Sequence, residues 1–305
     1  MRSEDDYLLS EFKKTLLRNT GENVVDLDDG ISHKFGFTLQ RFEDILRVVG
    51  YTIHPNRWSY HRIGLTTNGS GEFITGLYNF KAKKNTLVVI PSRMITSSRN
   101  WAPDTKGYFA LFNLDFFLQN NFPLKYFENK KILSSSYQPY INLTNEQADK
   151  VSNIFETIIR EKNSANIIKN ELMALKLIEL VIMSEQYFDE HLHFEEDLPT
   201  LDIIKRFTEL VESNFMEQRT VKFYADQLNI HPNYLNALVK KHTGTTVKES
   251  LQNKLLLEIK YLLHCTNLSI KEISSKVGFN DANYFTSFFT RLEKTSPGKY
   301  RSSIV

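Results

Sequence analysis

The chain has 305 residues, of which 41% are hydrophobic, and a formal net charge of +2. This length fits about two domains, and the apolar fraction is sufficient for packed cores. A single cysteine, Cys265, excludes an internal disulfide and a cysteine metal cluster. The first residues show no signal peptide, and no run reaches the roughly 20 apolar residues of a membrane span, so we expect a soluble cytoplasmic protein.

Residues 1–20 are expected to form an arm, and residues 21–143 are expected to form a domain built from strands. Asn68-Gly69 followed by Ser70-Gly71 predicts a hairpin turn. Many short apolar runs between turn signals indicate a β-sandwich or barrel. The candidate strands cover residues 36–39, 64–67, 71–75, 86–91 and 108–112.

The run from His61 to Ser92 resembles the cupin-like sensor domain of some bacterial regulators. This resemblance implies a barrel with an internal pocket for a small-molecule effector. Candidate pocket residues are His61, Phe73, Tyr78 and Trp101.

Cupin enzymes hold a metal through a close histidine pair, so an enzyme is an alternative function. His54 and His61 lie seven residues apart, without the spacing that points two imidazoles to one side of a strand, and His33 is isolated. The one His-x-His, at residues 191–193, lies in an acidic stretch that is typical of a solvated linker. We therefore expect no metal, no cofactor and no catalytic residues, with a cupin-derived enzyme as the alternative.

Two helices are predicted over residues 144–188. Thr144 to Gln147 form a capping box, followed by an apolar stripe from Val151 to Ile159 at helical spacing. A second helix, 164–188, has a broad apolar surface that could cover the barrel or pair two chains; we favour a homodimer through Leu172 and Ile178. Residues 189–200 are expected to be a linker, with Thr200 capping a helix over 201–215.

One helix-turn-helix pattern occurs twice near the end of the chain, at about 221–242 and 270–293. The offset between the copies is 49 residues in their first halves and 50 in their second halves, so one residue is inserted at the turn. Helical spacing, a polar break and helical spacing again define each copy. The shared apolar positions are Val221, Tyr224, Ala225, Leu228, Ile230, Tyr234, Leu235, Leu238 and Val239, matched by Ile270, Ile273, Ser274, Val277, Phe279, Tyr284, Phe285, Phe288 and Phe289.

Capping residues support these boundaries. Ser269 opens a capping box, Asn280-Asp281 can cap the next helix, and Pro232 fits a first helical position, although His231 before it is a poor cap. Thr246 opens another capping box, and the helix from about 246 to 264 would be roughly 28 Å long. Successive major grooves on one face of DNA lie about 34 Å apart, so such a helix can set the separation of two recognition helices.

The residues from Gly278 to Phe285, then Phe288-Phe289 and Ser296-Pro297, resemble the signature of the AraC/XylS family of bacterial transcription regulators. The resemblance covers roughly residues 201–305. It implies a double-stranded DNA partner, contact with RNA polymerase, and activation in response to an effector. Lys294 departs from the family pattern, because a glycine usually ends this helix; a non-glycine residue in a left-handed cap costs about 1 kcal/mol.

The charge distribution favours DNA over a mere helical bundle or protein-binding module. Residues 219–301 contain 13 Lys or Arg and 6 Asp or Glu, a net charge of +7, which leaves −5 for the remainder of the chain. Basic charge gathered on one helical domain is typical of phosphate binding. A purely constitutive regulator, with a domain that only assembles, stays open as an alternative.

Helical geometry predicts which side chains face DNA. Leu235, Leu238 and Val239 of the first copy, and Phe285, Phe288 and Phe289 of the second, are expected to face the core. The other positions of these two helices therefore turn outward. Asparagine can pair with adenine through two hydrogen bonds, whereas basic residues further along each helix suit phosphates. The predicted contacts, which match positions used in the family, are Asn233, Asn236, Ala237, Lys240, Lys241, Ala282, Asn283, Tyr284, Thr286, Ser287 and Arg291.

Together these observations predict an α+β multidomain chain. It would contain a cupin-like barrel at 21–143, a helical dimerisation segment at 144–188, a linker at 189–200 and an all-α DNA-binding domain at 201–305. Two helix-turn-helix motifs joined by a linker helix would make up that last domain.

Overall fold

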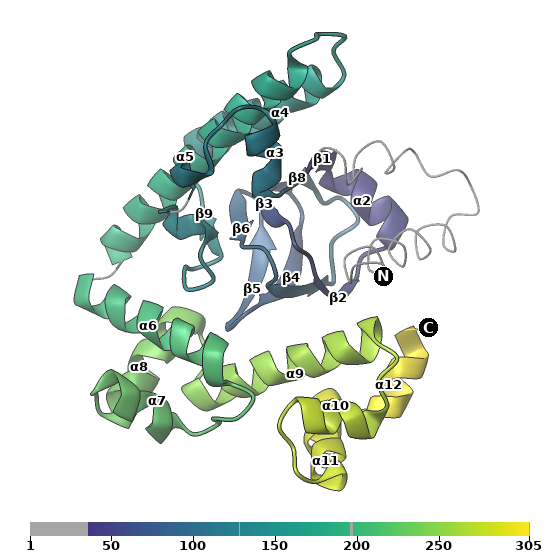
Figure 1. The fold of residues 1–305 in the computed structure, drawn as a ribbon, viewed down its shortest axis with the longest axis vertical. Helices are drawn as coiled ribbons and strands as arrows, with labels where there is room; N and C mark the ends of the chain where they lie inside the picture. Colours follow the sequence, from purple (N-terminus) through teal and green to yellow (C-terminus); the bar gives the residue numbers. More distant parts are fainter. Residues whose placement is uncertain (1–35, 128, 196–197, 305) are drawn as a thin grey trace.

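The computed structural model describes residues 36–127, 129–195 and 198–304. Two antiparallel sheets form the first part of the chain, and helices form the second part (Figure 1). The expected arm at 1–20 and His33 lie outside the described residues. No helix in the described ranges is long and apolar enough to cross a membrane.

The first sheet has five strands and the second has four. The five-stranded sheet has the order β1 (Phe37–Arg41), β8 (Lys106–Phe112), β3 (His61–Asn68), β6 (Thr86–Ile90) and β9 (Tyr140–Asn142). The four-stranded sheet has the order β2 (Ile53–Arg57), β7 (Ile95–Arg99), β4 (Ser70–Thr75) and β5 (Tyr78–Lys83). Among the described residues no ladder joins the two sheets, so the strands form an open sandwich and the prediction of a closed barrel is wrong.

The predicted hairpin at Asn68-Gly69 is also wrong, although a turn does occur there. Gly69 has a φ of +78°, but the turn connects β3 in one sheet to β4 in the other. The hairpin lies one strand later, where Gly76 (φ +55°) and Leu77 join β4 to β5 and Thr75 pairs with Tyr78. An Asn-Gly pair supplies the positive φ that a turn needs, but the burial of the two flanking strands decides which sheet each one joins.

Helices α4 (Asn145–Lys162) and α5 (Lys169–Glu195) cover the five-stranded sheet. The capping box at Thr144 is present, as predicted. Glu156 fixes α4 to the sheet, because its carboxylate accepts two hydrogen bonds from Arg41 at 2.9 Å and a third, 2.5 Å long, from the Tyr108 hydroxyl. Shorter helices complete this part: α2 (Phe42–Val49), α3 (Leu114–Gln119), η1 (Leu124–Tyr126) and η2 (Lys131–Leu133).

Helix occupies most of the stretch that was expected to be a linker. α5 continues to Glu195, and α6 (Leu198–Asn214) begins two residues before Thr200, which therefore lies inside that helix and does not cap it. An acidic composition is typical of a solvated helix surface as well as of a loop, so composition alone does not distinguish the two.

The remaining helices follow the predicted boundaries closely. They are α7 (Val221–Leu228), α8 (Pro232–Thr243), α9 (Val247–Cys265), α10 (Ile270–Lys276), α11 (Ala282–Glu293) and α12 (Pro297–Ile304). α10 begins 49 residues after α7, and α11 begins 50 residues after α8, which confirms the residue inserted at the turn.

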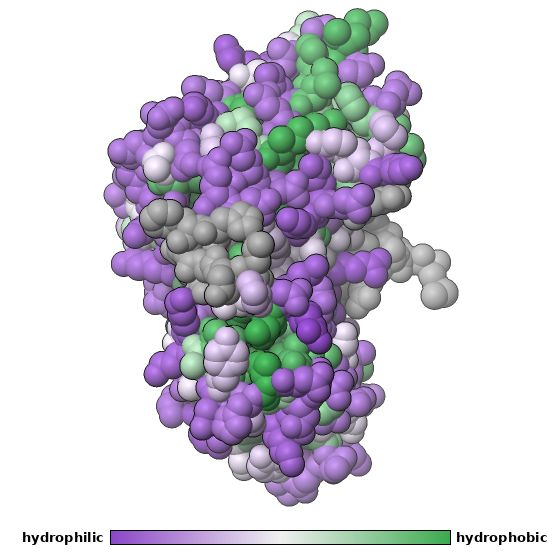
Figure 2. All heavy atoms as spheres, turned by 90° about the vertical axis from the view of Figure 1, so that its left-hand side faces the viewer, coloured by the Kyte–Doolittle hydropathy of each residue, from purple (hydrophilic) through white to green (hydrophobic). Residues whose placement is uncertain are grey.

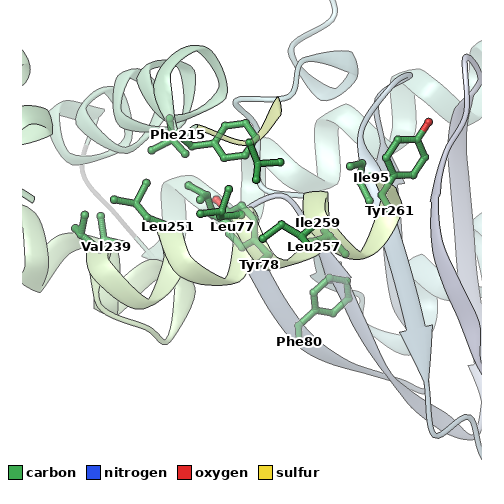
Figure 3. Close-up of a cluster of buried hydrophobic side chains, with 14 of the residues drawn as sticks. Leu77, Tyr78, Phe80, Ile95, Phe215, Val239, Leu251, Leu257, Ile259 and Tyr261 are labelled. Atoms are coloured by element: carbon green, nitrogen blue, oxygen red, sulfur yellow. The ribbon is translucent and has the colours of Figure 1, made fainter. Parts of the chain in front are cut away.

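The four-stranded sheet packs on α9, so the two parts of the chain share one apolar core. Tyr78, Phe80 and Ile95 belong to the same buried hydrophobic cluster as Leu257 and Ile259 of this helix (Figure 3). In Figure 1 the sheets lie above α9, while α10 and α11 lie below it and α7 and α8 lie near its left end. α9 is therefore the element through which the sheets contact both helix-turn-helix units.

Candidate nucleic-acid interface

α8 and α11 each present one face to the protein and one to solvent. Leu235 and Val239 of α8, and Phe285, Phe288 and Phe289 of α11, are buried as predicted. Among the predicted contacts, the exposed residues are Asn233, Ala237, Lys240, Lys241, Ala282, Asn283, Tyr284, Ser287 and Arg291, whereas Asn236 and Thr286 are half-buried.

Asn236 has a structural task that the sequence did not indicate. Its Oδ1 accepts a hydrogen bond of 3.1 Å from the backbone N–H of Val247, the first residue of α9. That N–H is one of the donors that a helix leaves without an internal partner. Pairing with adenine through both amide atoms requires Oδ1, so this hydrogen bond competes with base reading by Asn236.

Tyr234 is an exposed residue of α8 that the predicted contact set lacks. Its side chain is 47% exposed, and it occupies the position of Tyr284, which is 64% exposed, in the second copy. The 50-residue offset pairs the two tyrosines, so the sequence does indicate that Tyr234 can be exposed like Tyr284. The apolar pattern alone assigns Tyr234 to the core.

The ends of the two recognition helices are held in different ways. Nδ1 of His231 accepts from the Asn233 N–H at 3.2 Å, so this residue does cap α8, contrary to prediction. Oδ1 of Asp281 accepts from the Tyr284 N–H at 2.6 Å and caps α11, as predicted. At the other ends, Gly244 (φ +77°) and Lys294 (φ +60°) both adopt the left-handed conformation.

α9 joins the two units and is buried along most of its length. Each of three charged side chains on it pairs with a different element. Lys254 pairs with Glu212 of α6 at 2.6 Å, Lys260 with Glu293 of α11 at 2.5 Å, and Glu258 with Arg57 of β2 at 2.6 Å. These pairs are partly buried, so losing one partner leaves a partly desolvated charge without its counter-charge, and each pair therefore favours one geometry.

Arg219 connects the two units directly. It precedes α7, and its Nη2 donates to three carbonyl oxygens: Met216 at 2.9 Å, Val277 at 2.6 Å and Gly278 at 2.9 Å. The guanidinium also stacks on the Phe279 ring, 4.1 Å from its centre. The flank of the first unit is thereby fixed to the turn of the second, which constrains how α8 and α11 are oriented relative to each other.

The four candidate pocket residues do not share one site. Phe73, Tyr78 and Trp101 belong to or pack on the core shared with α9, where Trp101 donates to the Ser98 hydroxyl at 2.8 Å. His61 lies on the other face of the five-stranded sheet, stacked on Phe112. Burial, reinforced by the charge of the adjacent Arg62, lowers the pKa of His61 to about 4.

The histidines give no metal cluster within the ranges that the structure describes, where no group of three or more potential ligands occurs. The His54 ring packs against that of His264, with centres 5.3 Å apart. This contact places His54 at the junction of β2 and α9.

Two helix-turn-helix units pack on one buried helix, and the second helix of each has an exposed polar face. This arrangement defines the class of proteins with two helix-turn-helix units. Residues 224–303 match a family model described as a helix-turn-helix domain. This match lies within the stretch whose residues resemble the AraC/XylS family, so that resemblance is supported for this domain.

Two regulatory proteins are similar to the chain. The chain is 29% identical over 162 residues to the Msm operon regulatory protein of Streptococcus mutans, covering 52% of this chain and 57% of that protein. It is 25% identical over 174 residues to the HTH-type transcriptional activator RhaR of Salmonella dublin, covering 55% and 59%. The matches thus span a little over half the length of these relatives.

Among solved structures, the chain is similar to the C-terminal domain of the two-component response regulator yesN from Fusobacterium nucleatum. The identity is 30%, and the match covers 31% of this chain and 93% of that one, with a TM-score of 0.30.

Proposed function

We propose that the protein is a sequence-specific, double-stranded DNA-binding transcription regulator that inserts α8 and α11 into successive major grooves. The observation that carries this proposal is the duplicated unit on α9, a helix of 19 residues. At 1.5 Å per residue this helix is roughly 28 Å long, which suits the spacing of about 34 Å between successive grooves. The net charge of +7 over residues 219–301 supports phosphate contacts.

Base reading falls to the exposed polar residues near the start of each recognition helix. We assign it chiefly to Asn233 and Asn283, with Tyr234 and Tyr284 beside them. Ala237, Ala282, Thr286 and Ser287 line the same faces and would make van der Waals or hydroxyl contacts. Lys240, Lys241 and Arg291 lie further along and would bind phosphates.

The test is a selection from randomised duplexes with the full chain, followed by affinity measurements over a salt series. Asn283→Ala is expected to relax preference at one base position, with a loss of about 1–3 kcal/mol of discrimination. Lys240→Ala is expected to weaken all sequences about equally and to reduce the salt slope by about one. Failure to enrich any sequence would reject the proposal.

We propose in addition that the protein activates transcription in response to an effector, through contact with RNA polymerase. It is supported by the similarity to the transcriptional activator RhaR, and by the packing of the four-stranded sheet on α9. Transcription from the selected site, with and without the chain, would give the sign of regulation.

We propose further that the chain forms a homodimer through α5. Leu175 and Ile182 of α5, and Ile168 just before it, are exposed and seven residues apart, the spacing by which two helices pair along one face. Figure 2 shows hydrophobic atoms gathered at the upper end of the molecule, where α5 begins. Of the residues chosen from the sequence, Leu172 is half-buried, and Ile178 is half-buried against the core.

The dimer is tested by replacing Leu175 and Ile182 with glutamate in the full chain. Sedimentation should then show a folded monomer. Asn153→Glu, on the exposed surface of α4, is the control and should leave a dimer unchanged. A monomeric unmutated chain would rule out this interface.

A further inference from the structure

Arg62 is a buried cation that has no acidic partner among the residues that the structure describes. Its side chain projects from β3 toward the four-stranded sheet and is 1% exposed. Nη1 donates to Oδ1 of Asn56 at 3.2 Å and to Oγ1 of Thr96 at 2.7 Å, and Nη2 donates to the Met94 carbonyl at 2.7 Å. All three acceptors are neutral, and among the described residues no carboxylate lies within ion-pair distance of it. Taking an unpaired charge out of water costs several kcal/mol.

Two hydrogen-bond donors near this guanidinium have no acceptor. Nε of Arg62 is buried without one, and so is the hydroxyl of Thr75. Thr75 pairs with Thr96 in the β4–β7 ladder, so the two side chains share a face, and Thr96 already contacts Arg62. A native structure leaves few buried donors unsatisfied, and two beside one unpaired cation are what an anion would satisfy.

The surroundings of Arg62 limit the kind of anion. Its neighbours across the ladder, Ile90 of β6 and Leu111 of β8, are both buried and apolar. The Trp58 ring lies 5.6 Å from the guanidinium carbon. A carboxylate attached to a small apolar body fits this combination better than a multiply charged phosphate, which would need more than one cation.

β2 connects this cluster to the DNA-binding helices. Asn56 of β2 contacts Arg62, while the next residue, Arg57, contacts α9 through Glu258 at 2.6 Å and through the Tyr261 ring at 4.7 Å. β2 is an edge strand that pairs only with β7, and its register shifts between Ile53 and Asn56. An edge strand held by side chains on both faces can shift when one of those contacts is replaced.

We propose that Arg62 binds the carboxylate of a small apolar effector between the two sheets, and that β2 transmits this binding to α9. A carboxylate binds a guanidinium more strongly than an amide or hydroxyl oxygen does, so it displaces Asn56 and Thr96 from Nη1. Asn56 is then released, and the Arg57–Glu258 contact changes with it. This inference rests on the proposed function and names the ligand class of its sensor.

The binding step is tested without DNA, by the fluorescence of Trp58. The chain has two tryptophans, so Trp101→Phe leaves Trp58 as the single reporter. Butyrate is the probe, butyramide is its neutral isostere, and inorganic phosphate and sodium chloride control for charge. We expect a saturable change in Trp58 fluorescence with butyrate and with none of the other three compounds. This change should be lost in Arg62→Gln and weakened in Thr75→Val.

Three outcomes would overturn the binding site: no saturable response to butyrate, an equal response to butyramide or phosphate, or an unchanged response in a folded Arg62→Gln chain. Thr38→Val is the matched control, because the Thr38 hydroxyl is also buried without a partner but lies on β1 at the far edge of the five-stranded sheet. It should leave the response to butyrate intact.

The transmission step is tested on the selected DNA site. Butyrate should change the dissociation constant of the full chain for DNA by about fivefold or more, the lower end of measured couplings. Arg57→Ala should retain the fluorescence response and lose this change. A chain that binds butyrate but no DNA sequence would reject the proposed function and leave the binding site standing, whereas DNA binding without a butyrate response would reject only the site.

Discussion

The two helix-turn-helix units have corresponding helices but different turns. Three residues separate α7 from α8, and five separate α10 from α11. The first turn uses Asn229 in the left-handed conformation (φ 54°), and the second uses Gly278 (φ 76°). A Cβ on Gly278 would lie 2.6 Å from the Met216 carbonyl oxygen, at the flank of the first unit. The turn of the second unit is therefore also an interface with the first, which a repeat of sequence alone does not reveal.

Gly278→Ala is expected to have the largest effect on this comparison. The left-handed conformation costs an alanine about 1 kcal/mol, and the contact with a backbone oxygen adds about 2 kcal/mol of overpacking. We expect the free energy of unfolding to fall by about 3 kcal/mol, measured by urea denaturation of the full chain.

Two other glycines separate these contributions. Gly244 also has a positive φ, but no atom lies within 4 Å of its would-be Cβ, so Gly244→Ala should lose about 1 kcal/mol. Gly298 has neither constraint, and Gly298→Ala should lose nothing. Equal losses in the free energy of unfolding for Gly278→Ala and Gly244→Ala would show that the contact with Met216 does not affect stability.

Arg219→Ala would break the link between the units without touching a recognition helix. Hydrogen bonds from a charged donor are worth about 1.5–3 kcal/mol, and the three here share one nitrogen, so we expect a loss of about 2 kcal/mol in stability.

The second readout of this variant is the spacing of the DNA site. One base pair inserted between the half-sites rotates them by roughly 35° relative to each other. The unmutated chain should lose affinity for such a site, whereas Arg219→Ala should tolerate it better. Arg219→Lys keeps the charge but cannot stack and donate in the same plane, so it should behave like alanine. An unchanged penalty in both variants would leave Arg219 with a purely local role.

Asn236→Ala tests which role that asparagine has. The hydrogen bond to Val247 predicts a loss of about 1 kcal/mol in stability and little change in base preference. The matching residue, Thr286, bonds within its own helix to the Ala282 carbonyl, and the second unit has Pro297, with no N–H, where the first has Val247. Thr286→Ala should therefore cost little. A relaxed base preference in Asn236→Ala would instead show that this residue contacts a base.

The sequence predicted the helical part of the fold well because local signals decide it. Capping boxes at Thr246 and Ser269 and the apolar period fix each helix within its own segment. The sheets were predicted less well, since strand partners are set by burial far along the chain, as the turn at Asn68-Gly69 shows.

The candidate site divides in the same way. Exposure of Asn283 or Arg291 follows from helical geometry, and the structure agrees. The tasks of Asn236 and Arg219 depend on residues 11 and 58 positions away, and no local pattern contains that information. The same applies to Arg62, whose missing counter-charge is visible only in three dimensions.

Lys294→Gly is the smallest expected effect and the one that tests a departure from the family pattern. Lys294 occupies the left-handed cap at φ 60°, where its N–H donates to the Thr290 carbonyl at 2.9 Å. Glycine removes about 1–2 kcal/mol of strain but adds roughly 0.4–1 kcal/mol of entropy to the unfolded chain. The lysine amino group also donates to the Arg291 carbonyl at 3.0 Å, an exposed contact of little worth. We therefore expect a net gain of about 0.5–1 kcal/mol in the free energy of unfolding. The reverse change in the first unit, Gly244→Lys, should lose a similar amount, because open space surrounds that position and only the strain is added. A loss of stability in Lys294→Gly would mean that the lysine side chain stabilises the end of α11 by more than the left-handed backbone strain costs.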